Sequence, residues 1–567
     1  MMLDQSIKNE MEEFHAEIDI FERQYKKCIA AEIFQATLSI KEQAVLNDRL
    51  RPFACDTWYN SEKCCIDGTR TALLGEINTW GSPDTGDQSS RVFWLHGIAG
   101  SGKTTIAHST AVKFKQLGLL GAVFFGRRDH SEFNDPQKVL PTLAHQLAQV
   151  DFGYKDHVIK QLEVHRLSAE MSVSDQYDIL FHKYVTETSK KDTKTRRIFV
   201  VDALDECGEP ATRQSLVKSI VRLSSSVRPF YVFVTSRNED DIHSQLVTET
   251  TKEVNIFDYN ADTDIRKYIY TFIANPTLKV KLRISEQQID SLTKLSSGLF
   301  IWISTVLRFL GDSFNYKRDL KQILAGSNHA GAVSSLDQMY RTILNIVSGE
   351  NNVDNKIVVK EMLAVILSAS KRKAMPTCML AVIFSEVDEE GEIQMDIIRR
   401  LHSVVYVDAE EDDTLRIYHA SFADFLQTKA RCGDFFEEEA IINSKIVAQC
   451  LSYMSQNLKF NICGLESSFV LNKDVTDLQE RIETNISQSL KYTCYFWTSY
   501  LDCLFGVVLL DIYQFLNTPS LMYWIEIFTL LDELDTMMDR LRVLYSKLPI
   551  VSTSISHLQT RTDENEV

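Results

Sequence analysis

The residues with the clearest chemistry follow the spacing G-x-x-x-x-G-K-[ST]. Glycine tolerates positive φ and lets backbone N–H groups curl around an anion. A lysine at this spacing reaches the β- and γ-phosphates of a nucleotide, and the hydroxyl after it holds Mg²⁺. The pattern therefore predicts a P-loop that binds a nucleotide and magnesium. Its residues are Gly97, Ile98, Ala99, Gly100, Ser101, Gly102, Lys103 and Thr104, and Thr105 extends the site.

The flanking residues favour a real site over a chance loop. Val92–His96 is an apolar run of strand length, and a helical pattern that starts at Lys103 continues to Phe114. A strand, a glycine-rich turn and a helix are the context that this motif requires. The start of the helix also adds unpaired N–H groups and a positive dipole end, which favour a phosphate.

A group of acidic residues follows a second apolar run, Ile198–Val201. Asp202 would emerge at the carboxyl end of that strand, where ligands bind in open α/β sheets, and would bind Mg²⁺ through water. Asp205 and Glu206 would lie near the γ-phosphate, where one of them could polarise an attacking water. The alternative for Asp205 and Glu206 is a polar helix N-cap.

Arg237 closes a third strand pattern, after Val234, Thr235 and Ser236. A guanidinium at a strand end suits the charge and geometry of a γ-phosphate. We therefore group Arg237 with Asp205 and Glu206 as candidate catalytic residues. The alternative is an arginine in contact with solvent.

These side chains need a sheet to bring them together. Apolar runs alternate with helical patterns up to about residue 257, which predicts parallel strands with helices on both faces. The near-continuous apolar character of the runs fits strands buried on both sides. The predicted strands are Val92–His96, Leu119–Phe125, Arg197–Leu204, Phe230–Thr235 and Glu253–Phe257, and the predicted helices among them include Gln137–Val150, Tyr154–Leu167 and Ala211–Leu223.

Helical patterns predominate after residue 260 and also cover residues 8–48. Two short β-like runs, 404–407 and 415–418, flank an acidic turn and predict a hairpin after helices, as in a winged helix. The chain end, 561–567, reads as a frayed tail. We predict an N-terminal helical segment (1–52), a P-loop NTPase domain (53–262), a helical domain (263–332), a winged-helix-like domain (333–432) and a C-terminal helical domain (433–567).

The composition narrows the class of protein. A chain of 567 residues is too long for one core, and its net charge of −17 opposes a nucleic-acid-binding surface. The N-terminus lacks a signal-peptide pattern, and the most apolar stretches are too short or interrupted to span a membrane. Eleven scattered cysteines without C-x-x-C pairs indicate reduced thiols, so we expect a cytoplasmic protein without a zinc site.

Several motifs together resemble one family. Asp202-Ala203-Leu204-Asp205-Glu206 is similar to the Walker B form of NACHT domains, in the STAND class of P-loop NTPases. The entry to the P-loop strand resembles the nephrocystin-3-like NACHT modules of fungal NLR-like proteins. Further matches lie in a helical and a winged-helix domain and extend the resemblance over roughly residues 50–540. The matching segments are Tyr59-Asn60-Ser61, Gly68-Thr69-Arg70, Phe93-Trp94-Leu95, Gly298-Leu299-Phe300-Ile301-Trp302 and Tyr418-His419-Ala420-Ser421-Phe422-Ala423-Asp424-Phe425-Leu426.

The resemblance implies a regulated switch. In such proteins ADP holds a closed form with the winged helix folded over the nucleotide, and ATP opens it and permits oligomerisation. It implies that His419 touches the ADP β-phosphate, although a lone histidine is otherwise more often a packed core residue. The implied ligands are ATP or ADP with Mg²⁺, and the residues alone leave GTP open.

The resemblance also implies partners and a role. The implied role is signalling in nonself recognition or programmed cell death. The implied partners are other proteins, or further copies of the chain in a homo-oligomer that forms on activation. Fungal members usually carry a repeat sensor after this point, and we expect a truncated chain or a switch core that works with others. The alternatives are a P-loop kinase or other conventional NTPase, and a scaffold that nucleotide only stabilises. Slow hydrolysis of ATP or GTP stays open.

Overall fold

The computed structural model describes residues 41–547, apart from short gaps. The gaps are 52–53, 56–58, 84–89, 129–132, 169, 187–195, 225–229, 277, 279–281, 326–330, 350–351, 386–391, 410–411, 468–469 and 503–505. Most of the predicted N-terminal helix, part of the acidic turn and the predicted tail lie outside the described residues. Residues 41–50 of that predicted helix are helical, with η1 at Leu46–Leu50.

A five-stranded parallel sheet forms the first part of the chain, as predicted, with strand order β2-β3-β4-β1-β5. β4 lies between the P-loop strand β1 and the acidic strand β3, so the polar ends of all three strands meet at one edge. The strands are β1 (Val92–His96), β2 (Leu120–Phe125), β3 (Arg197–Asp202), β4 (Phe230–Ser236) and β5 (Thr251–Asn255).

The third strand ends earlier than predicted. We expected Arg197–Leu204, but β3 ends at Asp202 because Ala203 adopts a left-handed conformation with φ of +56°. This backbone angle turns the chain sharply out of the sheet, since extended strands require negative φ. The turn places Asp205 and Glu206 above the strand ends instead of along the sheet.

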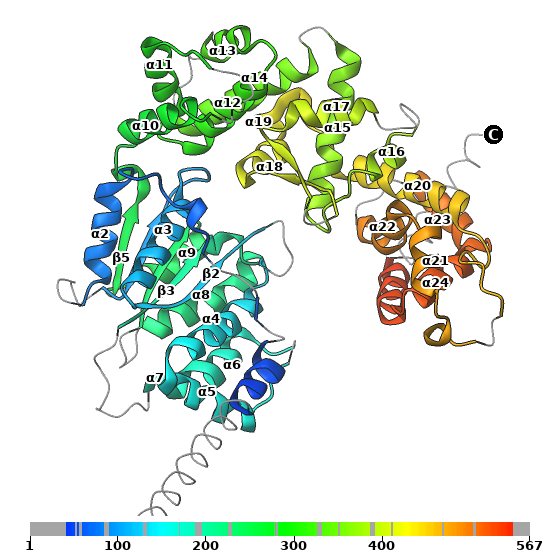
Figure 1. The fold of residues 1–567 in the computed structure, drawn as a ribbon, viewed down its shortest axis with the longest axis horizontal. Coiled ribbons are helices and arrows are strands. Elements are labelled where there is room, and N and C mark those ends of the chain that lie inside the picture. Colours follow the sequence, from blue (N-terminus) through cyan, green and yellow to red (C-terminus); the bar gives the residue numbers. More distant parts are fainter. Residues whose placement is uncertain are drawn as a thin grey trace, which may run out of the picture.

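Helices cover both faces of the sheet over two separate apolar cores. One core packs α2 and the P-loop helix α3 on one face, and the other packs α4 to α9 on the opposite face (Figure 1). These helices are α2 (Thr71–Gly81), α3 (Lys103–Gln116), α4 (Pro136–Val150), α5 (Phe152–Val164), α6 (Val173–Tyr177), α7 (Lys183–Thr186), α8 (Pro210–Ser224) and α9 (Asp240–Leu246), with short turns η3 (Ser61–Lys63), η4 (Asp178–His182) and η5 (Leu204–Glu206).

The remaining chain forms an arc of helices above and beside the sheet (Figure 1). The first five, drawn in green, follow the sheet directly. They are α10 (Asp262–Ile273), α11 (Glu286–Ser296), α12 (Phe300–Asp312), α13 (Tyr316–Ala325) and α14 (Ala332–Ser348), after the turn η6 (Ile256–Asp258).

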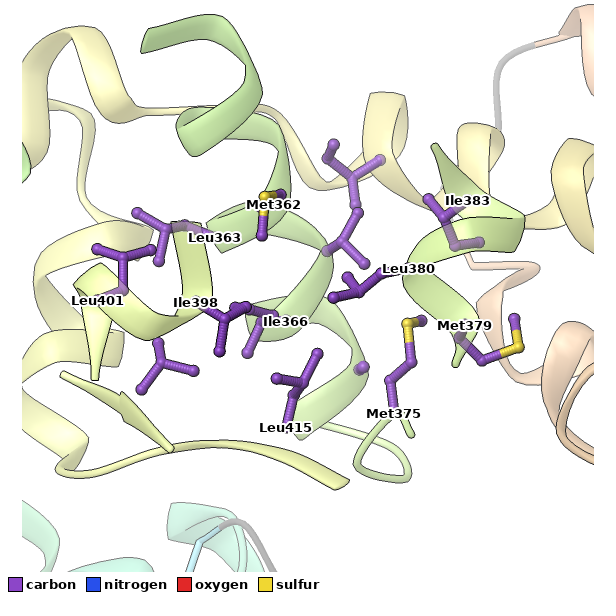
Figure 2. Close-up of a cluster of buried hydrophobic side chains, with 14 of the residues drawn as sticks. Met362, Leu363, Ile366, Met375, Met379, Leu380, Ile383, Ile398, Leu401 and Leu415 are labelled. Carbon is purple, nitrogen blue, oxygen red and sulfur yellow. The ribbon is translucent and has the colours of Figure 1, made fainter. Parts of the chain in front are cut away.

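The predicted hairpin is present, and it follows three helices. β6 and β7 pair antiparallel, and α15, α16 and α17 pack apolar side chains against them and one another (Figure 2). A hairpin after helices is what the sequence predicts for this part of the chain. The elements are α15 (Val353–Ser370), α16 (Met379–Ile383), α17 (Glu392–Leu401), β6 (Val405–Asp408), β7 (Thr414–Ile417), α18 (Ala420–Gln427), α19 (Lys429–Cys432) and η7 (Gly433–Phe435).

The last part is helical, as predicted. Its elements are α20 (Glu439–Asn457), η8 (Asn472–Asp474), α21 (Leu478–Asn485), α22 (Gln488–Phe496), η9 (Trp497–Tyr500), α23 (Gly506–Leu516) and α24 (Ser520–Leu530). One continuous apolar core runs from Ala261 to Leu544. We call this whole part, residues 261–547, the helical arm. No helix among the described residues is long and apolar enough to cross a membrane.

Candidate nucleotide site

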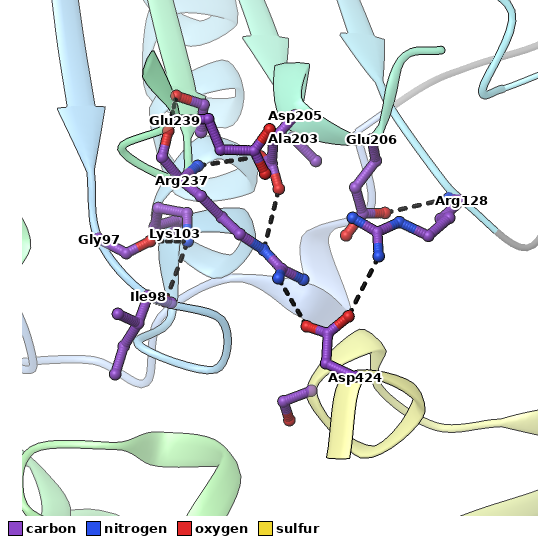
Figure 3. Close-up of polar contacts among 12 residues, drawn as sticks. Gly97, Ile98, Lys103, Arg128, Ala203, Asp205, Glu206, Arg237, Glu239 and Asp424 are labelled. Atoms are coloured by element: carbon purple, nitrogen blue, oxygen red, sulfur yellow. Dashed lines mark hydrogen bonds and ion pairs between the residues drawn. The ribbon is translucent and has the colours of Figure 1, made fainter. Parts of the chain in front are cut away.

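The P-loop has the conformation that the motif predicts. Gly100 and Gly102 have φ of +82° and +98°, which L side chains rarely adopt. Gly102 is also the residue before α3, so the loop leads directly into the helix N-terminus. The Lys103 Nζ donates to the carbonyl oxygens of Gly97 at 2.7 Å and of Ile98 at 3.1 Å (Figure 3). The lysine is thus held over the loop by the loop's own backbone.

The P-loop also contacts the helical arm. The Ile301 backbone N–H at the start of α12 donates to the Gly100 carbonyl at 3.1 Å. A Cβ on Gly100 would lie 2.0 Å from Ile301 Cγ2, so only glycine allows this approach. α12 therefore rests directly on the phosphate-binding loop.

Asp202 is 1% exposed and lies behind the loop with two hydroxyl partners. Thr235 donates a hydrogen bond to its carboxylate and accepts one from the Ala203 N–H at 3.0 Å, and the Thr104 hydroxyl lies near enough to favour the ionised carboxylate. Burial raises the pKa of Asp202 to about 6, against the opposing effect of these hydroxyls and Lys103. Adjacent hydroxyl and carboxylate oxygens are the donors that Mg²⁺ prefers, so the predicted pair of Thr104 and Asp202 fits that metal.

Asp205 is committed to Arg237. Its carboxylate accepts from the Arg237 backbone N–H at 3.0 Å and pairs with the Arg237 Nε at 3.1 Å (Figure 3). Burial lowers the pKa of Lys103, while the carboxylates of Asp205 and Asp202 act to raise it. These predicted residues therefore share one buried network of charges at the strand ends.

Glu206 has a different environment from its neighbour. Its Oε2 accepts a hydrogen bond from the Arg128 backbone N–H at 3.0 Å. Burial, and then the charge of Asp205, raise the pKa of Glu206 to about 7. A carboxyl group with a pKa near neutrality can take up a proton at physiological pH.

An aspartate of the helical arm joins this site. The Asp424 carboxylate on α18 pairs with the Arg237 Nη1 at 2.6 Å and the Arg128 Nη1 at 3.1 Å (Figure 3). We call this pair of ion pairs the Asp424 clasp. Arg128 follows β2 and Arg237 follows β4, so the clasp joins α18 to two strand ends.

His419, just before α18, faces the same loop. Its Nδ1 accepts from the Ser421 backbone N–H at 3.1 Å and so caps the helix. Burial, then the charges of Lys103 and Arg237, lower the pKa of His419 to about 4. The ring is therefore neutral near pH 7 with its proton on Nε2, a donor suited to an anion. Its Cε1 lies 3.6 Å from where a Gly100 Cβ would be.

A cavity of about 690 Å³ lies between these groups. Asp202 stands behind the lining, and Gly97, Ile98 and Ser101 form the loop beneath it. The lining also includes residues 62–66, 69 and 70, together with residues of the arm. The predicted site residues that line it are Ala99, Gly100, Gly102, Lys103, Thr104, Thr105, Asp205, Glu206, Arg237 and His419.

Asp424, Arg128 and Arg308 are among the residues of this site that the sequence analysis gave no role. Asp424 lies in the motif that contains His419, one and a half helical turns further on, but was given no role. Arg128 and Arg308 carry no local pattern at all. Only the docking of the arm brings Arg308 to the cavity and Arg128 to the clasp.

Solved structures resemble this chain only loosely. An Orc1 protein of Aeropyrum pernix in complex with DNA has a TM-score of 0.31 and 15% identity, covering 64% of this chain and 92% of that one. A Walker-type ATPase of Pyrococcus abyssi has a TM-score of 0.29 and 11% identity, covering 66% and 98%.

Sequence comparisons extend over more of the chain. The family described as Nephrocystin 3, N-terminal, matches residues 68–237. The vegetative incompatibility protein HET-E-1 of Podospora anserina is 26% identical over 528 residues, which are 86% of this chain and 37% of that protein. The chain thus spans little more than a third of that relative's length. These matches confirm the predicted resemblance: the chain resembles fungal NACHT-type P-loop NTPases, with a nephrocystin-3-like module over residues 68–237.

Proposed function

We propose that the protein is a nucleotide-dependent signalling switch, closed with ADP and open with ATP. The observation that carries the proposal is the set of contacts that the helical arm makes with the nucleotide site. His419, Ile301 and the Asp424 clasp all reach the P-loop or the residues beside it. These contacts come from two segments of the long helical extension, the start of α12 and the N-terminal part of α18.

The site residues have separate tasks in this proposal. The P-loop amides and Lys103 hold the phosphate chain, and Thr104 and Asp202 hold Mg²⁺, which would neutralise phosphate charge. The neutral His419 donates from Nε2 to a phosphate oxygen of the bound nucleotide in the closed form. GTP stays an alternative to ATP, because residues 59–70, near which the base would lie, carry no base-reading motif of their own.

The arginine of the clasp couples the nucleotide to the arm. Arg237 binds Asp424 in the closed form, although a guanidinium is equally suited to a γ-phosphate. A nucleotide shifts the equilibrium only if it binds the two forms differently. Competition between Asp424 and a γ-phosphate for Arg237 supplies such a difference, since ADP leaves the clasp intact.

The wider role follows from the relative. HET-E-1 is named as a vegetative incompatibility protein. We propose that this chain likewise serves nonself recognition or cell death signalling, through protein partners or a homo-oligomer that forms on opening. The nine cysteines of the described residues are free thiols, which supports the proposed cytoplasmic location.

The first test is the nucleotide that the protein carries. The full chain is purified without added nucleotide and denatured, and the released molecule is identified by chromatography. We expect stoichiometric ADP in the wild type and in the control Lys113→Ala, whose lysine is exposed on the same helix. Lys103→Ala should release none, because it removes the buried cation of the loop.

Two other results would contradict the proposal. An empty site with rapid turnover of ATP or GTP, stimulated by a small acceptor, would indicate a conventional kinase or NTPase. ADP retained by Lys103→Ala would mean that the P-loop does not hold it.

A further inference from the structure

Arg308 is a cation in the nucleotide cavity that the proposed function does not use. It lies on α12, two turns after Ile301, whose N–H bonds to the P-loop. Ile301, Ser304 and Arg308 line the cavity along one face of this helix. Helical side chains lean toward the helix N-terminus, so that of Arg308 leans toward the P-loop end of α12.

The guanidinium has no counter-charge in the part of the chain that the structure describes. No hydrogen bond or ion pair to Arg308 is formed there, and its Nε is buried without a partner. Its guanidinium lies over the Tyr418 ring, with Cζ 4.1 Å from the ring centroid. Arg237, by comparison, lines the same cavity with two carboxylates bound to it.

An arginine without a counter-charge in this cavity lowers the stability of the fold unless an anion binds to it. Burial lowers the pKa of Arg308, and the groups that act against this effect are the phenols of Tyr418, Tyr268 and Tyr340. A buried charge without a partner destabilises a fold, and an arginine fork matches phosphate oxygens. The charge of Arg308 also acts on His419, which lies against the P-loop.

We propose that Arg308 binds the phosphate chain of the nucleotide from the helical arm, with Tyr418 holding the guanidinium in place. This inference rests on the proposed function, since it requires nucleotide in this cavity. It adds a phosphate ligand that belongs to neither the P-loop nor the strand ends. Because α12 supplies it, the arm would gain binding energy from the phosphates as well as from the clasp.

The test compares two ligands in the full chain, emptied of nucleotide. A fluorescent ADP reports affinity directly, and inorganic pyrophosphate, which has no base, is measured by displacement. For Arg308→Met we expect both affinities to fall by about tenfold to hundredfold, the loss typical of a charged hydrogen bond. Arg308→Lys should recover part of both. The control Arg318→Met, an exposed arginine on α13, should leave both unchanged.

A structural role for Arg308 is separated by stability. The empty Arg308→Met protein should melt no lower than the wild type, because the substitution removes a partly buried charge that has no counter-charge among the described residues. A lower melting temperature of the empty protein would contradict the inference.

The affinities for ADP and pyrophosphate separate the other possible roles of Arg308. Unchanged ADP affinity would overturn the inference. Weaker ADP with unchanged pyrophosphate would also overturn it and would assign Arg308 to the base. If the wild type binds ADP no better than Lys103→Ala, the proposed function itself fails.

Discussion

Two neighbouring carboxylates show how the site divides its chemistry. Asp205 binds the Arg237 side chain and backbone, so each of its carboxylate oxygens has a partner. Glu206 accepts from one backbone N–H, and its pKa is near 7. A general base must be within reach of water and deprotonate near the working pH. Of the predicted catalytic residues, Glu206 therefore suits the activation of water, and Asp205 suits the positioning of Arg237.

We predict that Glu206→Gln slows nucleotide hydrolysis by about a hundredfold or more, the usual contribution of a general base. Nucleotide affinity should change little, because Lys103 and the loop amides are intact. The carboxylate is the active form, so the wild-type rate should rise as pH rises through about 7 and then level. Phosphate release measured across pH checks both statements.

The control for this experiment is Glu209→Gln, an exposed glutamate three residues further on. It should keep the wild-type rate and pH profile. A Glu206→Gln protein with an unchanged profile would remove Glu206 from the mechanism.

At this scale the residues fall into two groups by how predictable they are. Lys103, Thr104 and Asp202 lie in local patterns whose chemistry requires them, and the structure brings them together. Asp424 and Arg308 acquire a role only through the docking of the arm, and Asp424 lies 187 residues from Arg237 and 296 residues from Arg128 along the chain. No local pattern encodes such a contact, because it depends on how two separately packed bodies meet.

At the scale of elements, α18 acts as the contact between the arm and the strand ends. Its N-terminus carries the His419 cap, and Asp424 lies on it beside Arg237 and Arg128. The His419 ring and the Asp424 carboxylate both face the site from this one short helix. A movement of α18 would therefore break their contacts with the site at the same time. α12 meets the P-loop separately, through Ile301.

We predict that Asp424→Asn releases ADP about tenfold faster than the wild type. The Asp424 side chain is 18% exposed, so its pairing with two arginines is partly screened, and the effect is smaller than for a buried pair. Stopped-flow dissociation of fluorescent ADP measures it. Asp434→Asn, which breaks a pair on an 80% exposed carboxylate, should leave the rate unchanged.

Equal release rates for Asp424→Asn and the wild type would show that the clasp does not hold the closed form. The same samples should differ in radius by small-angle scattering if α18 has moved.

Most elements were predictable, and the exceptions have physical reasons. The buried parallel strands read as apolar runs because helices cover both faces, so their positions were found to within a few residues. The predicted end of β3 was wrong because Ala203 adopts a positive φ, for which alanine has no special tolerance. The order of the strands could not be read locally, since β4 enters between β1 and β3 only in three dimensions.

At the scale of the whole molecule, the apolar cores are divided. The two cores of the sheet contain residues from Leu46 to Ile256, and the core of the helical arm contains residues from Ala261 to Leu544. Between them lie ion pairs, the contacts of the P-loop, where Ile98 packs against the arm, and hydrogen bonds that join Asp67 and Arg70 to α10. An interface of this kind can open without exposing either core, as a switch requires.

The division of the cores also bears on synthesis at the ribosome. Domains fold as units and the N-terminal one folds first, so the sheet can close its cores while the arm is unfinished. The cavity would then meet cellular nucleotide, mostly triphosphate, before any lid exists. We predict that nascent chains stalled with residues 1–262 exposed bind fluorescent ATP, which a filter assay would detect, and that the same chains with Lys103→Ala do not. Failure of the wild-type nascent chain to bind would mean that the arm must be made first. If ATP binds before the arm closes over the cavity, each new molecule must hydrolyse one ATP before it reaches the closed form with ADP.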